Sequence, residues 1–184
     1  KKNAISFHNK KGILIMKYQF VVFLLLLFLT VLQSATNAQF TRQDLWLEMD
    51  DGVKLDVTKF IPSGPQPQGG FPAIIFVHGL GGSKQRMIND ARDYAQNGFV
   101  TLTYSVRGQG NSEGLSTVFS FREQQDLENI VNWLANDVFV NEDKIGISGG
   151  SQGGFHCWFA AVNGMKVKAV APENSIPQRV DAAA

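Results

Sequence analysis

Apolar residues along the chain fall into short runs that alternate with segments of helical periodicity. Residues 44–60, "DLWLEMDDGVKLDVTKF", alternate apolar and polar positions on both sides of Asp51-Gly52, which predicts two antiparallel strands joined by a tight turn. The surface loop "PSGPQPQGG" (62–70) follows. The continuous apolar run "AIIFVH" (73–78) then has the length of a strand buried on both faces.

Helical and β-rich segments alternate in the rest of the chain. We expect helices at 85–97, 121–137 and 152–163, and strands at 99–105, 144–148 and 167–172. In the second helix one buried face is predicted from residues at helical spacing: Leu127, Ile130, Val131 and Leu134. Gly98 is a suitable end for the first helix. Strands and helices in series imply a parallel sheet with helices on both faces. The predicted fold class is therefore α/β, with a mostly parallel sheet and the sequence stopping after about the sixth strand.

The first 38 residues have a different character. Met16 is the first methionine, and it begins a short basic start, an apolar run at 20–32 and a small, polar stretch ending at Ala38, which is the layout of a secretory signal peptide. The run holds 13 residues, and a helix needs about 20 to cross a bilayer; a retained membrane anchor stays as the alternative. The expected division is untranslated or mis-started sequence at 1–15, a signal peptide at 16–38 and the folded part at 39–184.

This division implies export to the periplasm or the extracellular space, and it changes the charge. All 16 acidic residues but only 12 of the 17 basic ones lie after residue 38, so the folded part carries a net charge of −4. We therefore expect no nucleic-acid partner, and no membrane contact after signal cleavage.

Cys157 is the only cysteine, so no internal disulfide can form, and it is interpreted as a packed thiol. The sequence makes no prediction of the oligomeric state.

The stretch "GISGGSQGG" places a serine among glycines at the turn between a predicted strand and a predicted helix. The spacing Gly149-x-Ser151-x-Gly153 is that of a nucleophile elbow. Side chains beside so sharp a turn would collide with the neighbouring strand and helix, and glycines remove these collisions. The helix N-terminus points free amides at the reacting centre, so the Gln152 amide is predicted to stabilise an oxyanion. A Gly-Ser turn without chemistry is the alternative, and the strand-to-helix context favours the nucleophile.

A second glycine-rich loop, "FVHGLGGSK" (76–84), follows the buried strand. In hydrolases of this architecture such a loop supplies the other oxyanion amide, and by position the candidate is Leu80. A phosphate-binding loop is excluded. Its motif needs a glycine directly before the lysine and another six residues before the lysine, and at these positions Lys84 has Ser83 and His78. His78 is expected to brace the loop.

A third loop, "YSVRGQGNSEG" (104–114), is not a dinucleotide fingerprint, because Glu113 stands where the third glycine is needed. Arg107 either holds the loops near the site by hydrogen bonds or is a solvated loop arginine. We expect no cofactor and no metal.

Five motifs, "DGVKL", "FVHGLGG", "YAQNGFV", "YSVRGQGNSEG" and "GISGGSQGG", occur in the order seen in α/β-hydrolases. Over residues 44–178 the chain most resembles the Xaa-Pro dipeptidyl-peptidase and cocaine esterase-like group. The resemblance implies hydrolysis of an ester or amide through a serine acyl-enzyme without a metal, with a peptide or small molecule as substrate. It carries over Ser151 as nucleophile and the Gln152 amide as oxyanion donor, and it makes 39–184 the N-terminal part of a longer hydrolase domain.

The chain departs from this group at two positions. The group often has a tyrosine after the nucleophile, where this chain has Gln152, and another in the loop where it has Leu80-Gly81. A peptidase of the Xaa-Pro type is the first expectation, and general aminopeptidases, acyl-esterases and lipases stay open. Two further alternatives are a binding protein that uses the fold without chemistry, and a truncated pseudogene product. The retained serine argues against the binding protein.

A catalytic serine needs a histidine as base and a carboxylate to orient it, in the chain order Ser, acid, His. After Ser151 the only histidine is His156, which lies five residues into the next helix and should be carried away from the hydroxyl. The carboxylates that follow are Glu173 and Asp181, for which capping or solvent exposure is expected. The catalytic acid and histidine are therefore expected beyond residue 184, and this piece alone is expected to lack full activity.

Overall fold

The structure is a computed structural model that describes residues 39–176, with residue 19 alone before them. The predicted upstream segment, the predicted signal peptide apart from residue 19, and Asp181 therefore lie outside the described residues. No helix among the described residues is both long enough and apolar enough to cross a membrane.

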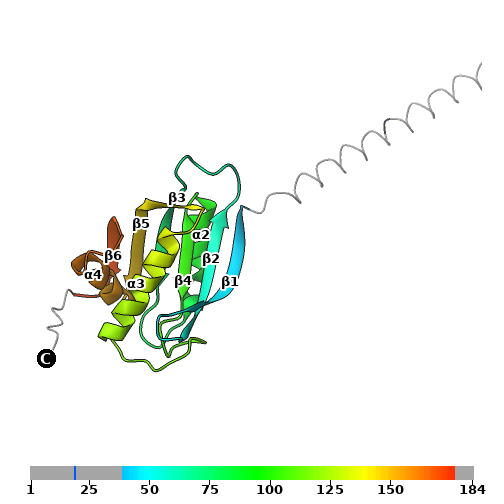
Figure 1. The fold of residues 1–184 in the computed structure, drawn as a ribbon. Coiled ribbons are helices and arrows are strands. Elements are labelled where there is room, and N and C mark those ends of the chain that lie inside the picture. The colour runs from blue at the N-terminus through cyan, green and yellow to red at the C-terminus, as the bar shows by residue number, and fades with distance from the viewer. Residues whose placement is uncertain (1–18, 20–38, 177–184) are drawn as a thin grey trace, which may run out of the picture. The chain divides into compact units, whose positions relative to one another are not determined.

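Six strands form one sheet in the order β1-β2-β4-β3-β5-β6 (Figure 1). The first two pairings, β1 with β2 and β2 with β4, are antiparallel, and the remaining three pairings are parallel. The predicted α/β class with a mostly parallel sheet is confirmed. The strands are β1 (Phe40–Glu48), β2 (Lys54–Pro62), β3 (Phe71–Val77), β4 (Val100–Tyr104), β5 (Val140–Gly150) and β6 (Ala169–Glu173).

The predicted hairpin forms between β1 and β2. Its turn is closed by a hydrogen bond of 2.8 Å from the Met49 amide to the Val53 carbonyl, and Gly52 takes a φ of 81°. A residue without Cβ adopts this left-handed conformation without strain, which is why the Asp-Gly pair marks the turn. The strands run further than the alternating pattern predicted, since Phe40 pairs with Pro62 at the open end.

The helices cover the two faces of the sheet, α3 and α4 on one face and α2 on the other (Figure 1). They are preceded by a 3-10 turn, and the bounds are η1 (Lys84–Met87), α2 (Ile88–Gln96), α3 (Phe121–Ala135) and α4 (Gln152–Val162). The prediction of one helix over 85–97 is wrong at its start, where the 3-10 turn stands. The reason is tertiary: the Lys84 side chain is drawn inside to Asp56, 2.6 Å away, and the Lys84 amide donates to Ser105.

The larger core lies between the sheet and the pair α3 and α4. Its α3 side is the face predicted from helical spacing, and all four residues of that face are fully buried: Leu127, Ile130, Val131 and Leu134. Each such side chain contributes about 1.5–3 kcal/mol of burial free energy. A smaller cluster on the opposite face joins Phe60 and Phe76 to Ala91 and Ala95 of α2.

Strand β5 is longer than the predicted 144–148, because it continues on both sides of the apolar run. At its start Val140 pairs with Phe71, and the register shifts before the next pair, Ala73 with Ile145. At its end β5 runs to Gly150, directly before Ser151. The strand therefore carries the glycine-rich stretch to the carboxyl edge of the sheet, where ligands of parallel α/β sheets bind.

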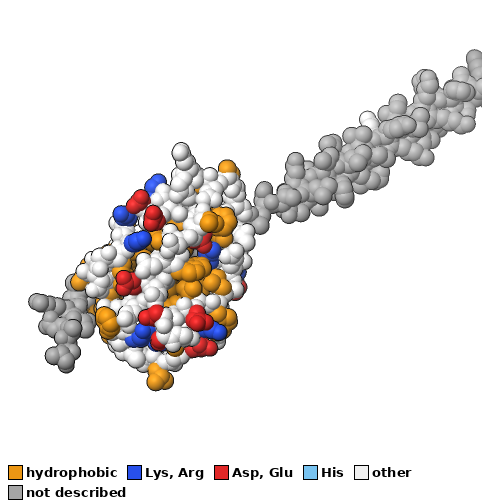
Figure 2. Space-filling model, viewed as in Figure 1, with side chains coloured by type: hydrophobic (Ala, Val, Ile, Leu, Met, Phe, Trp, Pro, Cys, Tyr) orange, Lys and Arg blue, Asp and Glu red, His pale blue; other side chains and the backbone are white. Residues whose placement is uncertain are grey.

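Charged side chains of both signs are interspersed on the face seen in Figure 2. This mixture agrees with the slightly acidic net charge of the folded part.

Candidate active site

Ser151 stands at the turn between β5 and α4, as the N-cap residue of the helix. Its backbone has φ 53° and ψ −117°, and its side chain is exposed. A non-glycine residue in this region is strained by about 1–3 kcal/mol, and such strain concentrates at functional sites. The predicted elbow geometry is confirmed: a strained serine at a strand-to-helix turn, open to solvent.

The spacing of the glycines around Ser151 has a direct steric cause. A Cβ atom on Gly153 would lie 2.0 Å from the Val77 carbonyl oxygen, and one on Gly149 would lie 2.6 Å from the same oxygen. Both distances are far inside van der Waals contact, so only glycine allows β3, β5 and α4 to approach this closely. Gly150 is different, because a Cβ there would meet nothing nearer than 3.9 Å.

The elbow is also held by the strand beside it. The Ser151 amide donates to the Glu173 carbonyl at the end of β6, over 2.9 Å. The Glu173 side chain is exposed, in agreement with the predicted solvent-exposed role. The Ser151 carbonyl accepts from the Phe155 amide, over 3.2 Å, and so begins the helical hydrogen bonding of α4.

The glycine-rich loop after β3 lies against Ser151. A Cβ on Gly79 would be 3.4 Å from both the Ser151 Cβ and the Gly150 carbonyl oxygen, so a side chain there would fill the space beside the nucleophile. The loop turns back through a hydrogen bond of 3.0 Å from the Gly82 amide to the Gly79 carbonyl. Leu80, between these glycines, is 55% exposed. The two predicted oxyanion donors therefore belong to segments that meet at the carboxyl edge of the sheet.

His78 braces this loop, as predicted. Its Nδ1 donates to the Gly79 carbonyl over 2.7 Å, and its Nε2 accepts from the Val106 amide over 2.9 Å. This pair of bonds requires the neutral ring, and burial lowers the pKa of His78 below its ordinary value. Because both ring nitrogens are engaged, His78 is not placed to take a proton from Ser151.

His156 is buried on α4, where its two ring nitrogens face side chains of β4 and α3. The Tyr104 hydroxyl lies 3.1 Å from its Nδ1, and a Glu123 carboxylate oxygen lies 3.5 Å from its Nε2 without forming a hydrogen bond. All three side chains are buried. Burial acts to raise the pKa of Glu123, but His156 and hydrogen bonds from Gln152 and the Phe119 amide outweigh it and hold that pKa below its ordinary value.

Sequence reasoning missed the side chains that surround this histidine. Gln152 is fully buried, and its amide group bridges Glu123 and Gln109. One local signal was available, since Ser120-x-x-Glu123 is a capping-box pattern and Ser120 does cap α3. No sequence pattern marked Gln109, because its partners come from two other segments of the chain.

The structure decides between the two roles that the sequence left open for Arg107, a loop-holding arginine or a solvated one. It is buried and makes paired hydrogen bonds of 2.6–2.7 Å to Asp126 on α3 and of 2.9–3.1 Å to Asp51 in the hairpin turn. The hydrogen bonds that Arg107 donates to Asp126, followed by those it donates to Asp51, raise the pKa of Arg107. Arg107 therefore holds the loop after β4 to α3 and to the β1–β2 turn, and is not a solvated loop residue.

Cys157 is the packed thiol that was expected. It is fully buried on α4, with its Sγ 3.8 Å from the Ala171 carbonyl oxygen. Burial raises the pKa of Cys157 to about 12. A thiol that stays protonated and buried is a poor nucleophile, which leaves Ser151 as the nucleophile that the elbow presents.

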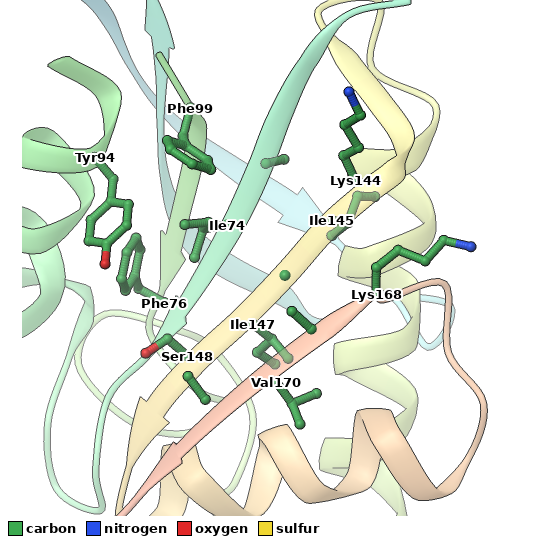
Figure 3. Close-up of a pocket in the computed structure, with 14 residues that line it drawn as sticks. Ile74, Phe76, Tyr94, Phe99, Lys144, Ile145, Ile147, Ser148, Lys168 and Val170 are labelled. Carbon is green, nitrogen blue, oxygen red and sulfur yellow. The ribbon is translucent and has the colours of Figure 1, made fainter. Parts of the chain in front are cut away.

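An apolar groove lies on the sheet face that α2 covers only in part (Figure 3). Tyr94 and Phe99 stand at one side of it, Ile74 and Phe76 of β3 line its floor, and the groove continues across β5 to β6. Ser151 is not among its lining residues. The groove is therefore separate from the elbow.

Comparison with known proteins places the chain in a family of hydrolases, in agreement with the strand-to-helix elbow. A profile described as X-Pro dipeptidyl-peptidase (S15 family) matches residues 51–184. The Escherichia coli protein named "Uncharacterized 31.7 kDa protein in traX-finO intergenic region" is 30% identical over 101 residues, which are 54% of this chain and 35% of that protein. The chain thus spans about a third of the length of the curated relatives it matches.

Solved structures show the same fold. An acetyl xylan esterase from Paenibacillus sp. R4 superposes with a TM-score of 0.65 at 20% identity, over 75% of this chain and 51% of that chain. A CocE/NonD family hydrolase from Staphylococcus aureus superposes with a TM-score of 0.58 at 23% identity, over 71% of this chain and 27% of that chain. At these identities the likeness concerns the α/β-hydrolase fold alone.

Proposed function

Since the chain belongs to the X-Pro dipeptidyl-peptidase (S15) family of α/β hydrolases, we propose that Ser151 is the nucleophile of a serine hydrolase that cleaves an ester or peptide bond. The observation that carries the proposal is the conformation of Ser151, exposed at φ 53° with the Gly79 loop in contact. A plain turn does not require this strain, and an exposed serine in this conformation supports a role in attack on a carbonyl.

The reaction follows from what lies around the hydroxyl. The Ser151 hydroxyl gives its proton to the base as its oxygen attacks the carbonyl carbon, and the carbonyl oxygen becomes an oxyanion between the Leu80 and Gln152 amides. Collapse of this intermediate breaks the bond to the leaving group, which takes that proton and departs as the alcohol or amine, and the acyl-serine that remains is hydrolysed by water in a second step. The N-terminus of α4 adds a partial positive charge on the side of the Gln152 amide.

The base and its orienting acid belong, in this proposal, to the part of the protein outside residues 1–184. The two histidines among the described residues have their ring nitrogens facing other partners: His78 between Gly79 and Val106, and His156 between Tyr104 and Glu123. The relatives of this chain are about three times its matched length, which leaves room for both residues in the order Ser, acid, His.

The substrate we propose first is a peptide, in keeping with the peptidase named by the family description. An acyl ester is the second candidate. It is favoured by Gln152 and Leu80, which stand where members of the resembling group often carry tyrosines, and a structural neighbour is named an acetyl xylan esterase. A panel with Gly-Pro 4-nitroanilide and 4-nitrophenyl acetate separates the two, because only a peptidase turns over the anilide efficiently.

A fluorophosphonate probe tests the nucleophile. In the intact protein we expect the probe to label Ser151, and Ser151→Ala to abolish both labelling and hydrolysis. Ser148→Ala is the matched control, because Ser148 lies on β5 and lines the separate groove; it should label like the unmodified protein. Labelling that survives Ser151→Ala refutes the assignment, and an intact protein that is never labelled would instead support a binding protein without chemistry.

We also propose that residues 16–38 direct export, from their basic start, apolar run and small, polar end. Fusion of residues 16–38 to the mature part of a periplasmic alkaline phosphatase should yield an active, cleaved reporter. The same fusion with Leu24→Arg and Leu26→Arg should stay inactive inside the cell. Equal reporter activity in both fusions would contradict the proposal.

A further inference from the structure

A line of hydrogen bonds joins the two segments that carry the proposed oxyanion donors, with one branch from the Gln109 Nε2 to the Ser116 Oγ over 3.3 Å. The Gly81 amide donates to the Gln109 Oε1 over 2.7 Å, and the Gln109 Nε2 donates to the Gln152 Oε1 over 3.0 Å. The Gln152 Nε2 in turn donates to a Glu123 carboxylate oxygen over 3.0 Å. Gln152 and Glu123 are fully buried and Gln109 is 8% exposed, so water is excluded from the two bonds that join these side chains, while the bond from the Gly81 amide is partly buried.

The two ends of this line fix the orientation of both glutamine amides. The Gly81 amide can only donate, so it must meet the oxygen of Gln109. The Glu123 carboxylate can only accept, so it must meet the nitrogen of Gln152. The remaining nitrogen of Gln109 and oxygen of Gln152 then face each other as donor and acceptor, and turning either amide over would place like groups together at two contacts.

The line joins the two segments that carry the proposed oxyanion donors. Gly81 directly follows Leu80 in the loop after β3, while Gln152 is itself the other donor through its backbone amide. Anchoring the Gln152 side chain limits rotation of the first turn of α4, and holding the Gly81 amide limits rotation of the loop. The spacing between the two backbone donors is therefore set by Gln109 and Gln152 together.

Glu123 is the anchor at the far end. In addition to the hydrogen bond from Gln152, its two carboxylate oxygens accept hydrogen bonds from the Thr117 and Phe119 amides over 3.3 and 3.1 Å. Phe119 and its neighbour Val118 have positive φ values of 63° and 35°, which non-glycine residues adopt only when held. One carboxylate thus fixes both a strained loop and the side chain of the residue after the nucleophile.

Resting on the function proposed above, we propose that Gln109, Gln152 and Glu123 form a positioning line that holds the two oxyanion amides at the separation the transition state requires. None of these side chains is required to touch the substrate. Their effect is on the rate of the chemical step, because oxyanion stabilisation depends on donors aimed at where charge develops.

The test is a double-mutant cycle in the intact protein with Gln109→Met, Gln152→Met and the pair. Methionine keeps the size and flexibility of glutamine but removes its hydrogen bonds. For 4-nitrophenyl acetate we expect kcat to fall about tenfold in each single variant, with KM within about twofold and Ser151 still labelled. Because one line is broken at either position, the double variant should be no more than about threefold slower than the slower single variant.

Two further variants keep the proposal open to refutation if a methionine variant fails to fold. Gln109→Glu keeps the acceptor for Gly81 but sets a carboxylate oxygen against the Gln152 Oε1, so its kcat should fall at least as far as that of Gln109→Met. Gln96→Met, at an exposed site on α2, is the matched control and should leave kcat and KM unchanged.

Unchanged kcat in both single variants overturns the positioning line, and so do losses that multiply in the double variant. If the unmodified protein itself is not labelled at Ser151, the proposed function fails first. If Ser151 is labelled and hydrolysis is normal in the variants, only the positioning line fails.

Discussion

His78 donates its Nδ1 proton to the carbonyl of Gly79, the next residue, over 2.7 Å. This carbonyl belongs to the same peptide unit as the Leu80 amide. Because a trans peptide holds its C=O and N–H on opposite sides, tying the carbonyl to His78 turns the Leu80 amide the other way. The histidine of the His-Gly pair thus orients a proposed oxyanion donor without contacting the substrate.

Replacing this histidine should slow the chemical step. His78→Phe removes the donor to Gly79 and leaves the Val106 amide without its acceptor, so the Gly79 carbonyl keeps only the Gly82 amide as donor and the Leu80 amide is held less firmly. We expect kcat for 4-nitrophenyl acetate to fall about 10–100-fold, since misplacing one oxyanion donor costs a large part of its contribution. Steady-state kinetics with fluorophosphonate labelling measure this; an unchanged kcat would mean that the Leu80 amide is oriented by other contacts.

The glycines of the elbow should differ sharply in their tolerance of alanine. Gly153→Ala places a Cβ 2.0 Å from the Val77 carbonyl oxygen, so α4 must move away from β3, and we expect a loss of about 3 kcal/mol or more in the free energy of unfolding. Gly150→Ala, where the nearest atom is 3.9 Å away, should change it by less than about 1 kcal/mol. Urea unfolding of both variants compares them; equal losses would contradict the steric account of the motif.

Arg107 should be more sensitive to the loss of Asp126 than to the loss of Asp51. Asp126 is 3% exposed at its side chain and Asp51 is 36% exposed, so water replaces only the second partner. We expect Asp126→Asn to destabilise the protein by about 3 kcal/mol, because it leaves part of a buried charge unpaired. Asp51→Asn should cost less than about 1 kcal/mol. Thermal and urea unfolding give the order, and the reverse order would show that the hairpin turn is the main support of Arg107.

Most of the fold could be predicted because its signals are local or periodic. The Asp51-Gly52 turn depends on one residue with positive φ, and the buried face of α3 depends on spacing within one helix. The geometry of the Ser151 elbow also follows from a few adjacent residues, since Gly149 and Gly153 are required wherever a strand turns so sharply into a helix. The roles of Ser151, Gln152 and Leu80 in catalysis stay predictions.

The features that were missed depend on partners far apart in the chain. Gln152 meets Gln109, 43 residues away, and Glu123, 29 residues away. A buried glutamine looks like an exposed one in a sequence, because its burial is set by the packing of α3 against α4. The 3-10 turn at Lys84 has the same origin, since its cause is an ion pair with Asp56 on β2.

The last prediction concerns pH and again depends on His78. Burial, with smaller effects of Arg86 and His156 in the same direction, lowers the pKa of His78, against the opposing hydrogen bond to Gly79 and the charge of Glu123. In the unfolded chain a histidine takes up a proton below about pH 6.5, while folded His78 stays neutral, so the unfolded state binds more protons. The free energy of unfolding should therefore fall from pH 7 to pH 5, by at most about 1.4 kcal/mol per pH unit from this residue.

The variant His78→Phe isolates this contribution. It has no proton to gain at this position, so its free energy of unfolding should decline less steeply between pH 7 and pH 5 than that of the unmodified protein, although it starts lower. Urea unfolding at half-unit steps of pH measures both slopes. This range lies above the region near pH 4 where unfolded carboxylates such as Asp44 begin to take up protons, and the pKa of Asp44 is held low by Arg42, Thr58 and Lys84. Parallel slopes would mean that His78 is protonated in the folded protein, and the hydrogen bond from the Val106 amide would then be absent.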